Sequence, residues 1–300
     1  MMLDIFYHPI YTYGIDERCR FPRDRYRLIH EKLTECKNKI NFVEPDMITV
    51  EDIYLAHDQS YVDSFFNNSM SKEVKRKIGL QPWNSFIFDR TRYILGGSLG
   101  AMNRAIENNS VAANLAGGTH HAFYEFGSGY CIFNDLAICA LKCFEDYQSI
   151  NNIIIIDLDV HQGDGTASIF SEVKNVFTFS MHCDSNFPLK KMKSNIDIPL
   201  KKGTGDEQYI NILKKNLQNI EQMEFDIIFF QAGVDILNED SMGHLNLTKK
   251  GIKQRNELIL KLSEKKKIPL VIFMGGGYSK PISHTVNSFV DLFLQSAKYC

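Results

Sequence analysis

Several features that would place this chain in a specialised class are missing. The seven cysteines are odd in number and include no C-x-x-C pair, which excludes a structural zinc knuckle, a redox pair or a disulfide framework. No segment approaches the ~20 consecutive apolar residues that span a bilayer. The N-terminal sequence MMLDIFYHPI also lacks the positive start and apolar stretch of a signal peptide. The sequence therefore predicts a cytoplasmic protein with reduced thiols.

An excess of charge of one sign is also lacking. The net charge is −2, from 34 basic and 36 acidic residues, so the chain has no positive field that would bind nucleic acid or an anionic membrane. The densest basic runs, KEVKRK at 72–77 and EKKK at 264–267, are typical of solvated helix faces. Neither G-x-x-x-x-G-K-[ST] nor G-x-G-x-x-G occurs, which argues against a nucleotide site.

What the chain does have is a regular alternation of short apolar runs and longer helix-like segments. This pattern predicts an α/β fold with a central, mostly parallel sheet flanked by helices. The predicted strands are 3–7, 111–116, 152–158, 175–181, 226–232 and 269–274. The predicted helices are 22–37, 51–68, 90–108, 135–147, 206–223, 248–265 and 283–298, and a long loop is predicted at 69–89. Because no Pro/Gly/Ser-rich spacer interrupts the pattern, residues 1–300 are expected to form a single domain.

Polar or glycine-rich residues directly follow five of the predicted strands. The five segments are VAANLAGGTHH, IIIIDLDVHQGD, VFTFSMH, DIIFFQAGVD and LVIFMGGGY. In open α/β sheets, ligands bind beyond the carboxyl ends of the strands. We therefore expect the five strand ends to converge on one crevice.

The segment DLDVH at 157–161 carries the strongest chemical signal. If it lies on a strand, Asp157, Asp159 and His161 point to one face, where three buried ionisable groups are costly unless they are paired or bind a cation. Asp235 in QAGVD is the candidate third ligand beside Asp159 and His161, and a helix N-cap is the alternative interpretation of this residue. Two carboxylates and one imidazole suit Zn²⁺ or Fe²⁺ and leave a position open for water, as in catalytic sites. The alternative is a buried Asp/His cluster without metal.

Two adjacent histidines, His120 and His121, follow a glycine pair at the end of another predicted strand. A histidine can take a proton from water if an acceptor orients its second ring nitrogen. Asp157 and Asp164 are the available acceptors, although simple turn formation in QGDGT is the alternative interpretation of Asp164. Tyr278, which follows three glycines, could donate its hydroxyl to a developing oxyanion.

Taken together, these segments resemble a known family. GGTHH, GYCIFND, DLDVHQGDGT, FSMH, QAGVD and GGGYS are similar, in this order, to the zinc-dependent histone deacetylases. The segments RFPRDRYRLI, HQGDG and AGVDILNEDSMGHLNLTKKGIKQRNELI are most similar to the class IV branch and its bacterial relatives. The resemblance implies the arginase/deacetylase fold and a zinc-dependent hydrolase that removes acyl groups from lysine side chains of proteins.

The resemblance also implies individual roles. It makes Asp159, His161 and Asp235 the ligands of one catalytic zinc per chain, His121 the general base and His120 its electrostatic or acid partner. Tyr278 becomes the oxyanion donor, and Asp157 and Asp164 become the partners of the two histidines. A structural potassium site would draw on Asp157, Asp159, His161, Ser180 and Met181.

The substrate tunnel is the part that the resemblance leaves most open. Gly129 and Tyr130 match the tunnel wall, where the family usually has Phe in place of Tyr130. Phe187 is the candidate opposite wall, with a plain rim residue as the alternative. The loop 183–190 is short, which favours long fatty acyl groups as well as acetyl. His57, Tyr61 and Trp83 are expected to serve packing, and His182 either lines the site or belongs to the core.

Three other functions compete with this interpretation. The same groups would serve hydrolysis of acetylpolyamines or other small amides, and a module that only binds acyl-lysine would share the tunnel. A dimanganese ureohydrolase is disfavoured because it needs further bridging aspartates. The physiological substrate and the oligomeric state are left open by the sequence.

Overall fold

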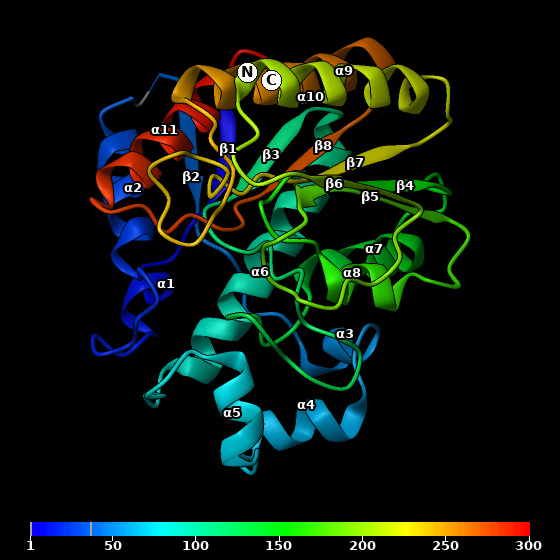
Figure 1. The fold of residues 1–300 in the computed structure, drawn as a ribbon. Coiled ribbons are helices and arrows are strands. Elements are labelled where there is room, and N and C mark those ends of the chain that lie inside the picture. Colours follow the sequence, from blue (N-terminus) through cyan, green and yellow to red (C-terminus); the bar gives the residue numbers. More distant parts are fainter. Residues whose placement is uncertain (1, 37) are drawn as a thin grey trace.

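Short runs of apolar and β-branched residues form one sheet at the centre of the molecule. The computed structural model describes residues 2–36 and 38–300. The strands are β1 (Leu3–Phe6), β2 (Ile40–Val43), β3 (Val111–Asn114), β4 (Ile153–Asp157), β5 (Val176–Cys183), β6 (Ile196–Leu200), β7 (Ile227–Gln231) and β8 (Leu270–Phe273). They pair in the order β2-β1-β3-β8-β7-β4-β5-β6, and every pair is parallel (Figure 1). The predicted α/β class with a parallel central sheet is confirmed.

The two strands that the sequence pattern missed lie at the two edges of this sheet. β2 (INFV) and β6 (IDIPL) alternate apolar with polar or proline residues and are only partly buried. An edge strand faces solvent on one side, so it needs no continuous apolar run and tolerates proline. The central strands β3, β4, β7 and β8 are buried at every position. Strands that are covered on both faces give the continuous apolar runs that made them predictable.

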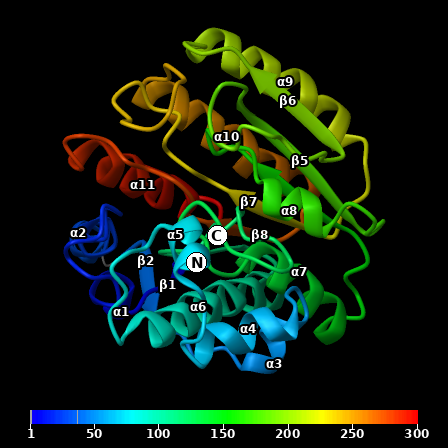
Figure 2. The ribbon, with the colours of Figure 1, turned by 60° about the horizontal axis from the view of Figure 1, so that its bottom comes forward.

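Helices cover both faces of the sheet. They are α1 (Ile10–Tyr13), α2 (Asp24–Thr34), α3 (Val50–Tyr54), α4 (Gln59–Phe66), α5 (Lys72–Ile78), α6 (Ile87–Asn108), α7 (Asp135–Asp146), α8 (Asp164–Ile169), α9 (Asp206–Glu221), α10 (Lys249–Lys266) and α11 (Ser283–Ser296). Figures 1 and 2 show α9, α10 and α11 on one face and α6 and α7 on the other, with α3, α4 and α5 further out. In the described part of the chain, no helix combines the length and apolar character that a bilayer crossing requires.

Helix caps explain where the predicted helices were wrong. The expected helix 51–68 is divided into α3 and α4, because the Asp58 carboxylate accepts from the backbone N–H of Tyr61 and starts a new helix there. His57 therefore precedes α4 and does not share a helix face with Tyr61; its Nε2 accepts from Asn134 N–H instead. The expected loop 69–89 contains α5, which Ser71 caps. The expected helix 22–37 is α2, and residue 37 lies outside the described residues.

The cysteines agree with the prediction of reduced thiols. Those at positions 19, 131, 139, 143 and 183 are buried and form no disulfide. Buried thiols of this kind act as small apolar side chains.

The turn that follows β3 is held by a buried carboxylate at the start of α7. Gly117 and Gly118 both have φ of +77°, in the left-handed region that favours glycine. Asp135 accepts hydrogen bonds from the backbone N–H groups of Gly118 (3.0 Å) and Thr119 (2.7 Å) and from the hydroxyls of Thr119 and Ser98 (both 2.6 Å). This carboxylate therefore fixes the chain direction just before His120.

Replacing Asp135 by Ala should lower the free energy of unfolding by about 3 kcal/mol, because buried donors lose their acceptor. Urea unfolding followed by circular dichroism measures this change. Asp146→Ala removes the other terminal aspartate of α7, which is exposed near Lys142, and should cost less than about 1 kcal/mol. Equal stability of the two variants would contradict the role given to Asp135.

Candidate active site

The loops that follow four adjacent central strands, β3, β8, β7 and β4, meet around one cavity of about 620 Å³. The Gln231 side chain at the end of β7 donates to the carbonyl of Gly118 (2.9 Å), which joins two of these loops directly. The loop after β5, the fifth predicted strand end, adds Phe187 to the lining, whereas Ser180, Met181 and His182 of β5 itself do not line the cavity. His182 is buried there with its Nδ1 2.9 Å from Ser180 Oγ, so it belongs to the core.

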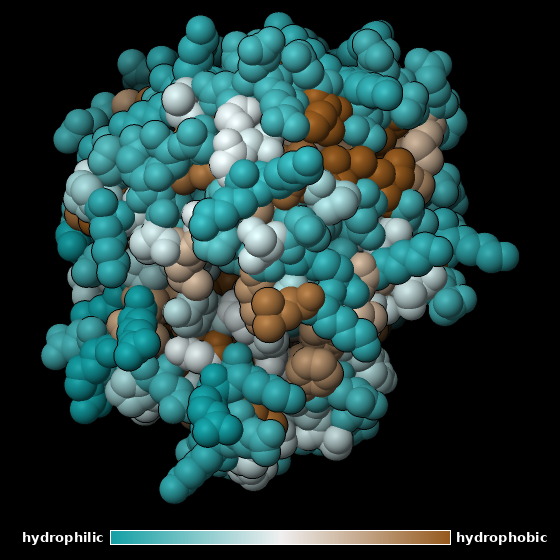
Figure 3. Space-filling model, viewed as in Figure 1, coloured by the Kyte–Doolittle hydropathy of each residue, from teal (hydrophilic) through white to brown (hydrophobic). Residues whose placement is uncertain are grey.

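Most of the predicted site residues face this cavity. Its lining includes His120, His121, Gly129, Tyr130, Asp159, His161, Phe187 and Tyr278. The remaining three, Asp157, Asp164 and Asp235, lie behind the lining and contact histidines in it. The face drawn in Figure 3 is hollowed near its centre, with hydrophobic residues in the hollow and hydrophilic ones around it.

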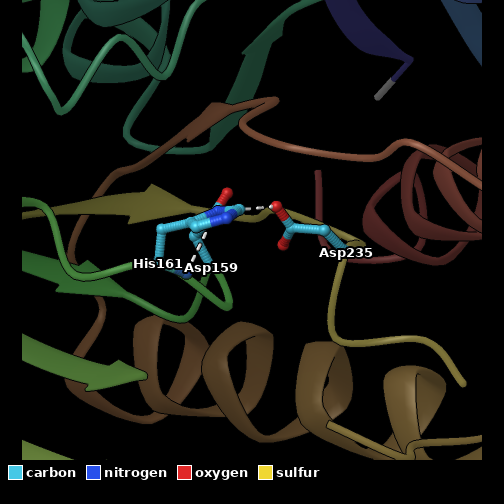
Figure 4. A group of neighbouring side chains, drawn as sticks. All are labelled: Asp159, His161 and Asp235. Carbon is cyan, nitrogen blue, oxygen red and sulfur yellow. Dashed lines mark hydrogen bonds and ion pairs between the residues drawn. The ribbon is translucent and has the colours of Figure 1, made fainter. Parts of the chain in front are cut away.

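Asp159, His161 and Asp235 form a buried group at the base of the cavity (Figure 4). Nδ1 of His161 lies 3.0 Å from Oδ1 of Asp159 and 3.2 Å from Oδ2 of Asp235. One ligand atom from each residue can be chosen so that all lie within 4.8 Å of one another. Within residues 2–36 and 38–300, this is the one group of three or more such side chains with that spacing.

A turn, and not a strand, positions Asp159 and His161, so the condition under which Asp157, Asp159 and His161 would share one strand face is not met. β4 ends at Asp157, whose Oδ1 accepts from the N–H of Asp159, and Oδ1 of Asp159 accepts in turn from the N–H of His161. Such side-chain-to-backbone bonds make short turns without a strand ladder. Asp235 also caps no helix; its Oδ1 accepts from Val160 N–H and ties the β7 loop to the β4 loop.

The surroundings of the group fit a bound cation. Oδ2 of Asp235 is buried and makes no hydrogen bond; its ion pair is with Nδ1 of His161, which Asp159 also contacts, so two buried carboxylates share one imidazole. A side chain at Gly276 would collide with this same oxygen, so the glycine keeps the space beside it open. Burial and the nearby Asp159 raise the pKa of Asp235 to about 7. The oxygen, nitrogen and oxygen donors match the preferences of Zn²⁺.

Each of the two adjacent histidines contacts its own carboxylate. Nδ1 of His120 lies 2.7 Å from Oδ2 of Asp157, and Nδ1 of His121 lies 2.6 Å from Oδ1 of Asp164. Asp164 is the first residue of α8, so its interaction with His121 goes beyond a turn. In both pairs the Nδ1–H donates, which leaves each Nε2 directed away from the carboxylate.

The two histidines nevertheless differ in charge. Burial opposes protonation of His120, but the carboxylates of Asp157 and Asp159 outweigh burial and raise its pKa to about 9. Burial and the positive charge of His120 lower the pKa of His121 to about 4 in spite of Asp164. At neutral pH, His120 is therefore a cation and His121 is a neutral base.

Aromatic rings and a glycine wall the approach to the histidines. A Cβ atom at Gly129 would lie 2.7 Å from Cδ2 of His121 and 3.2 Å from Cε1 of Phe187, so only glycine leaves this space open. The rings of His121 and Phe187 lie 4.9 Å apart, edge to face. Tyr130 lies 5.9 Å from the ring of Tyr278. Because Phe187 is 43% exposed, it marks the mouth of the cavity.

Sequence reasoning missed two residues that support Tyr278. Arg25 is buried beside the cavity, with its guanidinium 5.8 Å from the Tyr278 ring, and it donates to the carbonyl of Gly277 (3.3 Å). Oδ2 of Asp240 accepts from the Tyr278 N–H (2.6 Å). Arg25 lies in RFPRDRYRLI, but nothing in its local pattern distinguishes this buried arginine from the exposed or half-buried arginines around it.

The chain is similar to known proteins over most of its length. A family model described as the histone deacetylase domain matches residues 20–292. An uncharacterized protein of Picosynechococcus is 38% identical in an alignment of 293 residues that covers 95% of this chain and 95% of its own. Histone deacetylase 2 of Arabidopsis thaliana is 27% identical over 83% of this chain and 66% of its own length. The acetoin utilization protein AcuC of Staphylococcus aureus is 26% identical over 95% of this chain and 80% of its own.

If Asp159, His161 and Asp235 bind a metal ion together, Asp235→Ala should abolish metal binding, because the two remaining ligands bind the ion much more weakly than three. Elemental analysis of purified protein should find about one zinc per chain in the wild type and almost none in this variant. Asp184→Ala, which removes an exposed aspartate, is the matched control and should keep its zinc. Full metal content in Asp235→Ala would overturn the ligand assignment.

Proposed function

Because the chain belongs to the histone deacetylase family, which has the arginase/deacetylase fold, we propose that it hydrolyses acyl-lysine side chains of proteins. Water cleaves the amide, which yields a carboxylic acid and the free ε-amine of lysine. The observation that carries this proposal is that His120 and His121, each paired with its own buried carboxylate, line one cavity together with Asp159 and His161 of the Asp159, His161 and Asp235 group. Residues 1–300 act in it as one catalytic domain in the cytoplasm.

We assign Asp159, His161 and Asp235 as the ligands of one zinc ion per chain. When bound there, zinc polarises the amide carbonyl and lowers the pKa of water. The donor set, and the sharing of one imidazole by the two buried carboxylates of Asp159 and Asp235, support this assignment. The structural potassium site around Asp157 and Ser180 stays a prediction.

His121 is the general base in this proposal. Its Nε2 is unprotonated at neutral pH and can take a proton from the attacking water, while Asp164 holds the ring through Nδ1. His120 keeps a positive charge through Asp157 and stabilises negative charge that develops nearby. As a protonated group it is also suited to protonate the departing amine.

Tyr278 is the proposed donor to the oxygen that becomes negative as water adds to the carbonyl. Burial raises the pKa of its hydroxyl well above the ordinary value, so the proton stays in place at neutral pH. The backbone of Tyr278 is fixed by Asp240, and Arg25 lies beside its ring. A donor that is held in position before the reaction loses little free energy by reorganising.

The substrate side chain is proposed to enter between Phe187 and Tyr130, with Gly129 leaving room for it. An acyl-lysine side chain is long, narrow and uncharged, which suits an approach walled by aromatic rings. Apolar residues such as Phe21, Ile78 and Ile94 also line the cavity. They support the proposal that longer acyl chains fit as well as acetyl.

Tyr278→Phe should lower kcat by roughly 10²–10³, the usual effect of removing one oxyanion donor. Elemental analysis should find its zinc content unchanged. Tyr130→Phe removes a hydroxyl from the other aromatic ring of the pair and restores the usual family residue, so it should keep most of the activity. Wild-type activity in Tyr278→Phe would move the donor role to another residue.

A substrate panel tests the function itself. It compares kcat/KM of zinc-loaded protein on one peptide carrying acetyl, octanoyl or myristoyl lysine, and on acetylpolyamines. We expect the peptides to be cleaved faster than the polyamines and the longer acyl groups at least as fast as acetyl, because each buried methylene adds roughly 0.8 kcal/mol of binding. Cleavage of acetylpolyamines alone would make the protein a small-molecule hydrolase. A steady fall in kcat/KM with the length of the acyl chain would contradict the proposal that long acyl groups fit and would leave the protein a deacetylase.

A further inference from the structure

Exposed basic side chains from two distant segments border the mouth of the cavity. Arg18 and Arg20 precede α2, whereas Arg76 and Lys77 lie in the last turn of α5, and all of them belong to the cavity lining. Among the described lining residues, the one carboxylate is that of Asp159 at the base. The mouth is therefore strongly positive, although the chain as a whole has a net charge of −2.

These basic side chains belong to the wall of the approach. The backbone N–H of Tyr130 donates to the carbonyl of Ile78 (2.7 Å), and that of Gly129 donates to the carbonyl of Lys77 (3.3 Å). From the other segment, Sγ of Cys19 lies 4.0 Å from the carbonyl oxygen of Gly79. The end of α5 and the loop before α2 thus meet beside the tunnel, and the backbone that carries these charges is fixed relative to it.

Most of this charge is not neutralised by the protein. Arg18 pairs with Asp16 (2.9 Å). Among the residues that the structure describes, no carboxylate lies within 4.0 Å of a side-chain nitrogen of Arg20, Arg76 or Lys77. Lys77 instead lies over the ring of Phe126, 5.3 Å from its centre. The positive charges of Arg20, Arg76 and Lys77 are therefore available to a substrate that approaches the mouth.

We propose that this mouth selects acyl-lysine within acidic sequence, so that Asp and Glu residues next to the acylated lysine face Arg20, Arg76 and Lys77. The inference rests on the proposed function, because it assumes that acyl-lysine enters the cavity. Acylation removes the charge of the lysine, so the charge of the substrate at the mouth is that of its neighbours. Residues within two positions lie at most about 7 Å away along the chain, which is inside the Debye length of about 8 Å at physiological salt. Acidic neighbours are attracted and basic ones are repelled.

The experiment uses zinc-loaded full-length protein and acetyl-lysine peptides that differ only in having acidic, neutral or basic residues on both sides of the lysine. Fluorescence anisotropy gives Kd and a coupled assay gives kcat/KM, each at low and at high salt. We expect acidic flanks to be favoured over basic flanks by roughly tenfold in both measurements at low salt, with a smaller ratio at high salt.

Charge reversal locates the effect. The triple variant Arg20→Glu, Arg76→Glu and Lys77→Glu should invert the preference, so that basic flanks bind more tightly. The control, Lys202→Glu, Lys214→Glu and Lys250→Glu, changes the net charge equally at exposed positions away from the cavity lining and should keep the acidic preference.

Binding and turnover separate the two proposals. Equal Kd and kcat/KM for all flanks would overturn the acidic preference and leave the hydrolase intact. Tighter binding of acidic peptides without any turnover would support the proposed acidic preference of the mouth and refute the proposed hydrolase function. Loss of the preference in the control variant would also overturn the inference, because net charge alone would then explain it.

Discussion

The active site depends on how the buried charges of Asp159, His161 and Asp235 are compensated. The carboxylate of Asp159 accepts hydrogen bonds from the backbone N–H groups of His161 and Gly276. Its pKa lies far below the ordinary range, because the attraction of His120 and His161 outweighs the effect of burial. The charges of Asp159 and a protonated His161 cancel. The second carboxylate, that of Asp235, leaves the group with an excess of negative charge. A bound divalent cation would neutralise this excess negative charge. Without a cation, Asp235 has to bind a proton instead.

The same compensation sets the difference between the adjacent histidines. His120 lies close to two carboxylates and keeps its proton, and its charge then disfavours a second cation at His121. Two side chains of one type thus differ in pKa by several units because their neighbours differ. Asp135 contributes to this arrangement from a distance, since it fixes the glycine turn that carries both histidines.

The sequence allowed prediction of the sheet and of most groups at the cavity, because buried parallel strands are continuous apolar runs whose carboxyl ends coincide. It did not reveal β2 and β6, whose edge positions require no such run. It also left open whether Asp159 and His161 continue the predicted strand 152–158, because a spacing of two residues fits a strand and a chain of side-chain turns equally well. The roles of Asp135 and Arg25, and the basic mouth, depend on contacts between segments far apart in sequence, which no local pattern encodes.

Without a bound metal, the buried group of Asp159, His161 and Asp235 lacks the positive charge of a cation. Differential scanning calorimetry of chelator-treated protein with increasing zinc tests it most directly. We expect the Tm to rise steadily with zinc concentration, because a ligand that binds only the folded state stabilises it by mass action. A Tm that is independent of zinc in the wild type would contradict it and would leave the group an ion-pair cluster without metal.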